Sequence, residues 1–312
     1  MDDTEYVREE DREEYRRFAG HHHVIFASDR PPVNEIWHYT DAAGLIGIIQ
    51  SGEIWCTQVS CLNDSLEQRY FGDLVHASVK TLRASNTNLT LGVLLRVADD
   101  SLANQDVAPV GNFVACFSEV EDDLGQWRGY GGGQCGYALG FRVDRVLEAL
   151  KVRPSAAFLP MHYEHSRHQF LVADVLRMAQ AYFIQGVQRG LPDVERWARE
   201  FLDAFAMELG PFASVIKHPK FSSERERRIV TFLQKGEHTQ LEFRQRRTLL
   251  ARHLPIDLTV NVGTAKLLPL TRVYIGPGPT QRVSQVSVGD LLLKYGYQDV
   301  PVELSKVPYR VP

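Results

Sequence analysis

The sequence has no long apolar run and few cysteines. No stretch of its 312 residues approaches the roughly 18 apolar residues that a transmembrane helix requires, and the N-terminus lacks the basic and then apolar pattern of a secretory signal. The four cysteines form no CxxC pair, which favours reduced thiols over a redox or metal-binding motif. We therefore expect a cytoplasmic protein that makes no contact with a membrane.

The common motifs of covalent catalysis are also missing. No GxSxG element occurs, and Cys116 and Cys135 lie in an apolar run and beside glycines, where a thiol is usually inert. The net charge of −4 argues against a general nucleic-acid binder. Residues 217–252 nevertheless carry ten Lys and Arg against four Glu, so this region favours an anionic ligand.

The most informative segment is an alternating acidic and basic cluster that runs into an apolar stretch. Residues 224–228 read Glu-Arg-Glu-Arg-Arg and residues 229–233 read as a buried strand. A period of two places Glu224, Glu226 and Arg228 on one face. Charges at the mouth of a buried strand are costly unless they are paired or used. The cluster therefore predicts either a functional site or a set of ion pairs at a strand edge.

The remaining pattern predicts an α+β fold with a split or mixed sheet. Residues 1–30 form a charged N-terminal arm or helix, and residues 31–312 form a single domain with a helical insertion over 166–216. Residues 84–110 look polar and irregular, and Ser118 with Glu121 has the spacing of a capping box. Strands are expected near 36–39, 54–57, 113–117, 136–143, 228–233, 240–246, 255–261, 267–275 and 300–305, and helices over 64–83 and 287–295.

The order of several weak signals resembles a known family. His38-Tyr39-Thr40 ends a strand, Leu-Asn63-Asp64 opens a helix, and Cys-Phe-Ser-Glu follows at 116–119. Trp127 and Tyr130, the late acidic cluster and Ile-Gly-Pro at 275–277 complete the series. The chain from about 36 to 306 is identified by this order as a member of the largely bacterial family called domain of unknown function 2971.

A more distant resemblance, to the ADP-ribosyltransferase superfamily, implies a chemistry. In that superfamily a split sheet clamps NAD+ between an early His and a late Glu, with an aromatic ring on the nicotinamide. The resemblance implies that His38 and either Glu226 or Glu224 are catalytic. It further implies that the residues around NAD+ are His38, Tyr39, Thr40, Asn63, Asp64, Trp127, Tyr130 and Arg228. Tyr130 departs from the pattern because it lies on an expected helix.

The resemblance thus implies an ADP-ribosyltransferase or NAD+ glycohydrolase, with NAD+ as substrate and no metal, acting as a bacterial toxin or anti-phage effector. A protein or nucleic acid would accept the ADP-ribose, and the N-terminal arm would contact a partner. Two alternatives stay open. One is a non-catalytic module that binds a nucleotide or a protein. The other is a Mg-dependent nuclease that uses Asp64, Glu67, Glu224 and Glu226 as ligands.

Overall fold

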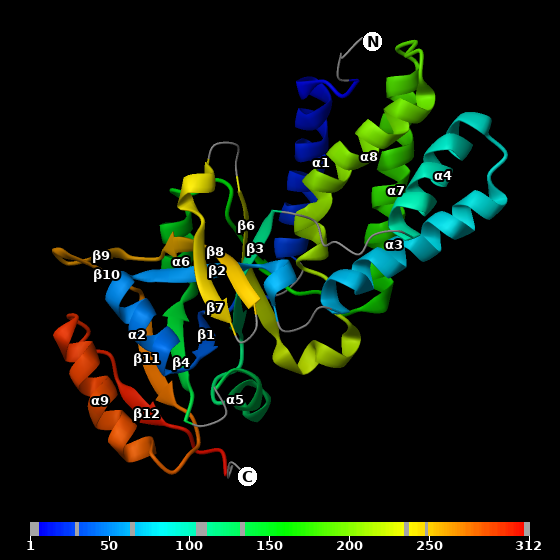
Figure 1. The fold of residues 1–312 in the computed structure, drawn as a ribbon. Coiled ribbons are helices and arrows are strands. Elements are labelled where there is room, and N and C mark those ends of the chain that lie inside the picture. Colours follow the sequence, from blue (N-terminus) through cyan, green and yellow to red (C-terminus); the bar gives the residue numbers. More distant parts are fainter. Residues whose placement is uncertain are drawn as a thin grey trace. The chain divides into compact units, whose positions relative to one another are not determined.

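The computed structural model describes residues 6–28, 31–62, 66–103, 111–131, 135–233, 237–246 and 249–308. The chain forms two compact units, each built from three separate stretches (Figure 1). Unit 1 comprises residues 1–29, 59–112 and 161–221, and unit 2 comprises residues 30–58, 113–160 and 222–312. The helices expected as an insertion over 166–216 therefore share unit 1 with the N-terminal segment and with residues 59–112.

Unit 1 is helical. Its helices are α1 (Glu9–Ser28), α3 (Leu66–Ser85), α4 (Leu89–Ala103), α7 (His165–Val187) and α8 (Val194–Ala213), with the 3-10 turn η1 (Val59–Cys61). They bury an aromatic core in which Phe183, Trp197 and Phe201 are inaccessible to solvent. The aromatic rings lie 5.5–6.3 Å apart, which is the spacing of favourable ring contacts.

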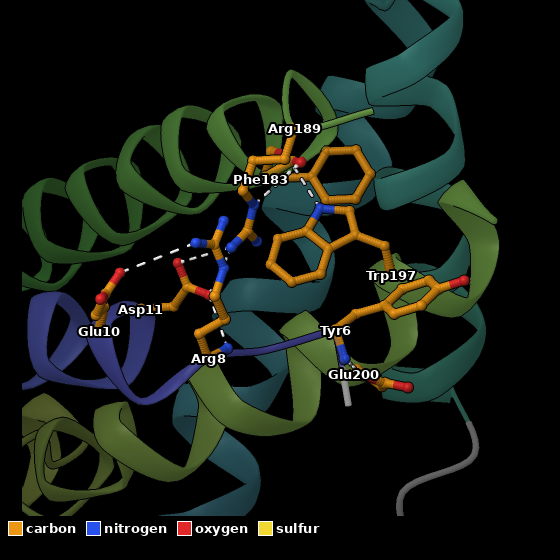
Figure 2. Close-up of polar contacts among 9 residues, drawn as sticks. Tyr6, Arg8, Glu10, Asp11, Phe183, Arg189, Trp197 and Glu200 are labelled. Atoms are coloured by element: carbon orange, nitrogen blue, oxygen red, sulfur yellow. Dashed lines mark hydrogen bonds and ion pairs between the residues drawn. The ribbon is translucent and has the colours of Figure 1, made fainter. Parts of the chain in front are cut away.

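The charged N-terminal segment forms helix α1, which packs on α7 and α8. Arg189 follows α7, places its guanidinium 4.9 Å from the Trp197 ring and donates to both oxygens of Asp11, at 3.0 and 3.3 Å (Figure 2). The Tyr6 amide donates to Glu200 at 2.6 Å. Tyr15 and Phe18 are buried in the same core. The acidic side chain of Asp11 is thus engaged inside unit 1.

Unit 2 contains a ten-stranded mixed sheet in the order β12-β11-β4-β1-β3-β2-β8-β7, with β6 pairing β3 and β5. Strands β11 and β12 are parallel, whereas the neighbours along the rest of this order, and β5 with β6, are antiparallel. The strands are β1 (Glu35–Thr40), β2 (Glu53–Gln58), β3 (Asn112–Ser118), β4 (Tyr137–Arg142), β5 (Ala157–Pro160), β6 (Glu226–Phe232), β7 (Glu242–Arg246), β8 (Leu249–Asp257), β11 (Leu270–Ile275) and β12 (Val302–Leu304). A separate ribbon joins β9 (Val260–Val262) to β10 (Ala265–Leu267).

Helices lie on both faces of this sheet. The main core lies between one face and the helices α2 (Ala42–Ser51), α6 (Val143–Leu150) and α9 (Gln281–Lys294). On the opposite face, the short helix α5 (Leu124–Tyr130) buries Trp127 against Trp37, Tyr39 and Tyr274. The expectation of an α+β fold with a mixed sheet is confirmed.

Strand β3 is the branch point of the sheet. It pairs with β1 at Trp37 and Ser118, with β2 at Thr57 and Val114, and also with β6. β1 then continues along β4 over its whole length, whereas β2 continues along β8. The sheet therefore divides at β3, and strands from distant parts of the sequence meet along this one strand.

Local signals explain the elements that flank the site. Asp41 caps α2 by accepting from the Gly44 amide, and Gly52 ends that helix at a φ of 74°, a conformation that glycine adopts without strain. Strand β2 then begins at Glu53 and is held in place by pairing with β8.

Three local predictions were wrong. Residues 84–110 contain the helix α4, whose Leu94, Leu95 and Val97 are buried. Helix α5 is capped by Asp123 rather than by a box at Ser118, because the Ser118 hydroxyl donates to the Glu224 carbonyl instead. Helix α9 begins at Gln281, six residues before the expected start at 287.

Candidate functional site

The acidic and basic cluster is divided by a turn. Residues 219–224 form the 3-10 turn η2 (Pro219–Glu224), and Arg225 has a φ of 44° before β6 begins at Glu226. A positive φ breaks the extended backbone, so the alternation holds only from Glu226 onward. Glu226 and Arg228 share a face as predicted, whereas Glu224 lies outside the strand. This places Glu226 rather than Glu224 in the rigid sheet.

Glu226 and Arg228 form a buried ion pair. The Arg228 Nε donates to Glu226 Oε1 at 2.6 Å and Nη2 donates to Oε2 at 3.1 Å, while the two residues are 4% and 1% exposed. A bidentate pair fixes the plane of the carboxylate as well as its position. Burial of two charges is tolerated only with such geometry. Arg228 therefore orients Glu226.

A second ion-pair group lies around Glu119 at the end of β3. Arg227 Nε donates to Glu119 Oε1 at 2.7 Å, and Arg225 Nη2 lies 3.2 Å from Oε2. The backbone of Glu119 donates to the Arg225 carbonyl at 3.0 Å, and the Ser118 hydroxyl donates to the Glu224 carbonyl at 2.8 Å. Residues 224–227 are thereby fastened to the end of β3. Sequence reasoning missed this role of Glu119, although it noted the Cys-Phe-Ser-Glu segment.

His38 lies on β1, one residue beyond the point where β1 and β3 pair. Its Nδ1 is 2.9 Å from the carbonyl oxygen of Cys116, and its ring is 5.5 Å from that of Phe117. A carbonyl only accepts, so Nδ1 carries the hydrogen and Nε2 carries the lone pair of the neutral ring. Burial lowers the pKa of His38, and the charge of Arg244 lowers it further against the opposing effect of the Cys116 bond. His38 is thus a neutral hydrogen-bond acceptor at pH 7.

The backbones of the two principal candidates lie at one end of β3. Trp37, the residue before His38, pairs with Ser118. The carbonyl of Arg225, the residue before Glu226, accepts from the amide of Glu119. Neighbouring strands lie about 5 Å apart, so each candidate is roughly one strand spacing from the Ser118–Glu119 segment. The branching of the sheet therefore brings two strands that are distant in sequence to one end of β3, while alternation places the His38 ring on the core face with Phe117 and the Glu226 carboxylate on the other face.

The aromatic candidates have different surroundings. Trp127 is 4% exposed, contacts Tyr39 edge to face at 4.7 Å and donates from Nε1 to Asp122 at 2.9 Å. The Tyr39 hydroxyl donates to the Val120 carbonyl at 2.8 Å, and burial raises its pKa. Both side chains thus hold the loop before α5 in place. Tyr130, at the end of α5, is 39% exposed and presents its ring to solvent.

The other predicted site residues lie away from the Glu226–Arg228 pair or outside the described residues. Thr40 ends β1 opposite Tyr137 and is half-buried. Asn63 and Asp64 lie outside the described residues, as does the side chain of Glu67. Among the described residues, no group of three or more His, Cys, Asp or Glu is arranged to hold a metal ion.

Backbone strain marks this end of the sheet. The positive-φ residues other than glycine in the described chain are Arg225 and Asp122, at 44° and 49°. Asp122 accepts from Trp127 Nε1 and from the Lys306 amide, and it also contacts Ser305. Such conformations persist only where neighbours impose them, and they cluster at functional sites.

Residues 126–229 match the family described as "Protein of unknown function (DUF2971)". This match confirms the family resemblance over a segment that contains Trp127, Tyr130, Glu224, Glu226 and Arg228. No curated protein and no solved structure matches the chain. Within the described residues, no helix is long and apolar enough to cross a membrane.

Proposed function

We propose that this chain, whose residues 126–229 match a family of unknown function, is an enzyme that consumes NAD+. It transfers ADP-ribose to a protein or nucleic acid, or it hydrolyses NAD+ to ADP-ribose and nicotinamide. The observation that supports this proposal is the buried carboxylate of Glu226, which Arg228 holds in one orientation at the Ser118–Glu119 end of β3. The role as a bacterial toxin or anti-phage effector rests on the family resemblance, and the cytoplasmic location rests on the unpaired pattern of the cysteines in the sequence.

The reaction breaks the bond between ribose C1′ and the nicotinamide nitrogen. The bonding electrons pass to the ring and remove its positive charge, while the ribose acquires oxocarbenium character. Water or an acceptor group then bonds to C1′ and loses a proton. A fixed carboxylate stabilises such a positive transition state when water is excluded. Glu226 fits this role because it is 4% exposed and is held in one orientation by Arg228.

In the proposed reaction, Glu226 accepts from a ribose hydroxyl at one of the roughly four lone-pair sites that a carboxylate offers. His38 supplies a second acceptor at Nε2, because the Cys116 carbonyl fixes its tautomer. Tyr130 is the exposed aromatic ring of α5 and suits a stacking role better than Trp127, which is buried.

The first experiment measures nicotinamide release from NAD+ by wild-type protein and by Glu226→Gln. The wild type is expected to release nicotinamide and the variant to lose at least about 100-fold in turnover, the loss typical of a removed electrostatic stabiliser. Glu224→Gln is the matched variant, with the same chemical change two positions away in the η2 turn, and it is expected to keep its turnover. A parallel assay with added cell lysate distinguishes transfer of ADP-ribose from hydrolysis of NAD+.

Folding must be separated from chemistry, because removal of Glu226 leaves Arg228 buried without this partner. The double variant Glu226→Gln/Arg228→Met removes both charges and is expected to fold while remaining inactive. If a folded double variant turns over NAD+ like wild type, Glu226 is not catalytic and the proposal fails.

The alternative of a non-catalytic binding module is favoured by one observation. Glu119, Arg227, Glu226 and Arg228 are all at most 7% exposed at the side chain and form two complete ion pairs, as a purely structural network does. Under this alternative, no lane of the assay releases nicotinamide, and the Glu226 and Arg228 variants change only stability.

A further inference from the structure

Aromatic and polar side chains gather on one face of β2, β8 and β7. Ile54 and Cys56 of β2 point into the main core, as do Leu254 and Ile256 of β8. Because side chains alternate along a strand, Trp55, Thr57 and His253 lie on the opposite face. Arg244 of β7 pairs with Ala251 and shares that face, since Ala251 and His253 are two residues apart on β8.

Arg244 is held in a fixed orientation on this face. Its Nη2 donates to the Thr57 hydroxyl at 2.8 Å, and its guanidinium carbon lies 5.3 Å from the centre of the Trp55 ring. Trp55 is 37% exposed, so the guanidinium lies at the border of the solvent. These two contacts orient the planar fork. An arginine oriented in this way is suited to bind phosphate in a bidentate manner.

His253 lies beneath this pair and is 1% exposed, with its ring 4.4 Å from that of Trp55. Its Nε2 is 3.4 Å from the carboxylate of Glu242, yet neither ring nitrogen makes a hydrogen bond of normal geometry within the described residues. Buried polar atoms of this kind are uncommon, and a water, an ion or a ligand group is able to satisfy them. Burial lowers the pKa of His253, and the charge of Arg244 lowers it further.

Arg244 also connects this face to the candidate site. Its charge lowers the pKa of His38, after the larger effect of burial. The same guanidinium therefore lies close enough to both histidines to act on them electrostatically. Among the described residues, the acidic groups on this face are Glu242, whose carboxylate lies 3.4 Å from His253 Nε2, and Glu53, whose pKa is raised by burial and then by the charge of Glu242.

We propose that Arg244, held by Trp55 and Thr57, binds the diphosphate group of the dinucleotide substrate, with His253 as the adjoining polar contact. This inference rests on the proposed function and assigns its phosphate site to the face of β2, β8 and β7. The resemblance placed Arg228 among the residues around NAD+. It is 1% exposed and holds Glu226, so it takes a positioning role instead.

The test is calorimetric titration of the full chain with ADP, with ADP-ribose and with inorganic pyrophosphate. None of these ligands contains the nicotinamide bond, so binding is measured without turnover. We expect Arg244→Gln to weaken ADP and ADP-ribose binding by about 10- to 100-fold, the effect of losing a charged hydrogen-bond donor. Arg244→Lys keeps the positive charge but loses the planar guanidinium. Its affinity for ADP and ADP-ribose is expected to lie between those of wild type and Arg244→Gln.

Arg252→Gln is the matched control. Arg252 lies on the adjacent strand, donates to Gln58 at 2.7 Å and shares its face with the core residue Leu254, so the same charge is removed from the opposite side of the sheet. Binding by this variant is expected to stay within about twofold of wild type. Equal weakening by Arg244→Gln and Arg252→Gln would show a general charge effect and overturn the assignment, provided that both variants melt like wild type.

The outcomes separate this inference from the proposed function. Arg244-dependent binding of ADP without any nicotinamide release would support the phosphate site and contradict the proposed enzymatic activity. Nicotinamide release by wild type, together with an unchanged ADP affinity of Arg244→Gln, would support the proposed enzymatic activity and contradict the phosphate site. Absence of ADP and pyrophosphate binding by wild type at millimolar concentration would also overturn the inference. Binding of pyrophosphate as tightly as ADP would place the whole interaction on the phosphates.

Discussion

Glu226 and Arg228 occupy the same face of β6 and bind each other through two hydrogen bonds of 2.6 and 3.1 Å. Arg227, between them in sequence, points the other way and binds Glu119 at 2.7 Å. A single short segment therefore supplies one arginine to each of two carboxylates on opposite faces of the sheet. Under the proposed function, the stability of the site and its chemistry depend on the same groups.

Removal of one partner of the buried pair should lower the free energy of unfolding more than removal of both. Arg228→Met leaves the Glu226 carboxylate without this guanidinium, and we expect a loss of about 3–5 kcal/mol in the free energy of unfolding. Glu226→Gln/Arg228→Met should recover most of that loss. Urea unfolding followed by tryptophan fluorescence measures both variants.

Arg225→Gln is the control for this pair, because the Arg225 side chain is 56% exposed. Its effect should stay within about 0.5 kcal/mol. A double variant no more stable than Arg228→Met would contradict the coupling that the geometry implies.

Arg189 should couple energetically to Asp11. The two side chains are 20% and 22% exposed and meet through two hydrogen bonds, with the guanidinium over Trp197. A double-mutant cycle with Arg189→Gln and Asp11→Asn should give a coupling energy of about 1 kcal/mol in thermal or urea unfolding. A coupling energy near zero would mean that α1 is held by its buried Tyr15 and Phe18 alone.

Two helical glycines of unit 1 should respond in opposite ways to alanine. A Cβ at Gly186 in α7 would collide with the indole ring of Trp197, whereas a Cβ at Gly72 in α3 meets no atom within 4 Å. Gly186→Ala should lower the free energy of unfolding by about 1–3 kcal/mol through overpacking. Gly72→Ala should raise it by up to about 1 kcal/mol through helix propensity. Equal effects in thermal unfolding would contradict the packing around Trp197.

Stability should fall as the pH drops below 6.5. Burial lowers the pKa of His38, His168 and His253 from the ordinary value of 6.5, so the unfolded chain binds protons more readily than the folded one. Their contribution is complete above pH 6.5 and is lost as the pH falls toward the folded-state pKa values. The slope should reach about 1.4 kcal/mol per pH unit for each histidine.

Melting temperatures at pH 7.5, 6.5 and 5.5 test this expectation, and His253→Gln should reduce the slope. Glu53 works in the opposite direction, because burial and the charge of Glu242 raise its pKa. Stability that is constant from pH 7.5 to 5.5 would show that the histidines are protonated without resistance in the folded protein.

Much of the sheet was predictable from local signals. β1 and α2 follow from an apolar strand, the Asp41 cap and Gly52, all of which act within a few residues. The pairing of Glu226 with Arg228 follows from alternation along a strand. The cap at Ser118 was wrong because its hydroxyl is taken by the Glu224 carbonyl, 106 residues away, and no local pattern reveals such a partner.

The site itself was predictable only in part. A positive φ at Arg225 has no signature in its residue type, so sequence placed Glu224 in the strand. The Arg244, Trp55 and His253 group was missed because its members come from three strands. Its signals were present: Trp55 and Thr57 alternate with core residues, and residues 217–252 are rich in arginine.

The division into two units has a consequence for the order of synthesis. The chain passes from one unit to the other five times, and unit 2 takes its last stretch from residues 222–312. Strands β6, β8 and β11 all lie in that stretch, so its sheet cannot assemble until almost the entire chain has left the ribosome. Unit 1 needs nothing beyond residue 221 and can fold earlier. Folding during translation should therefore begin with the helices, while β1–β4 wait for the strands that complete them.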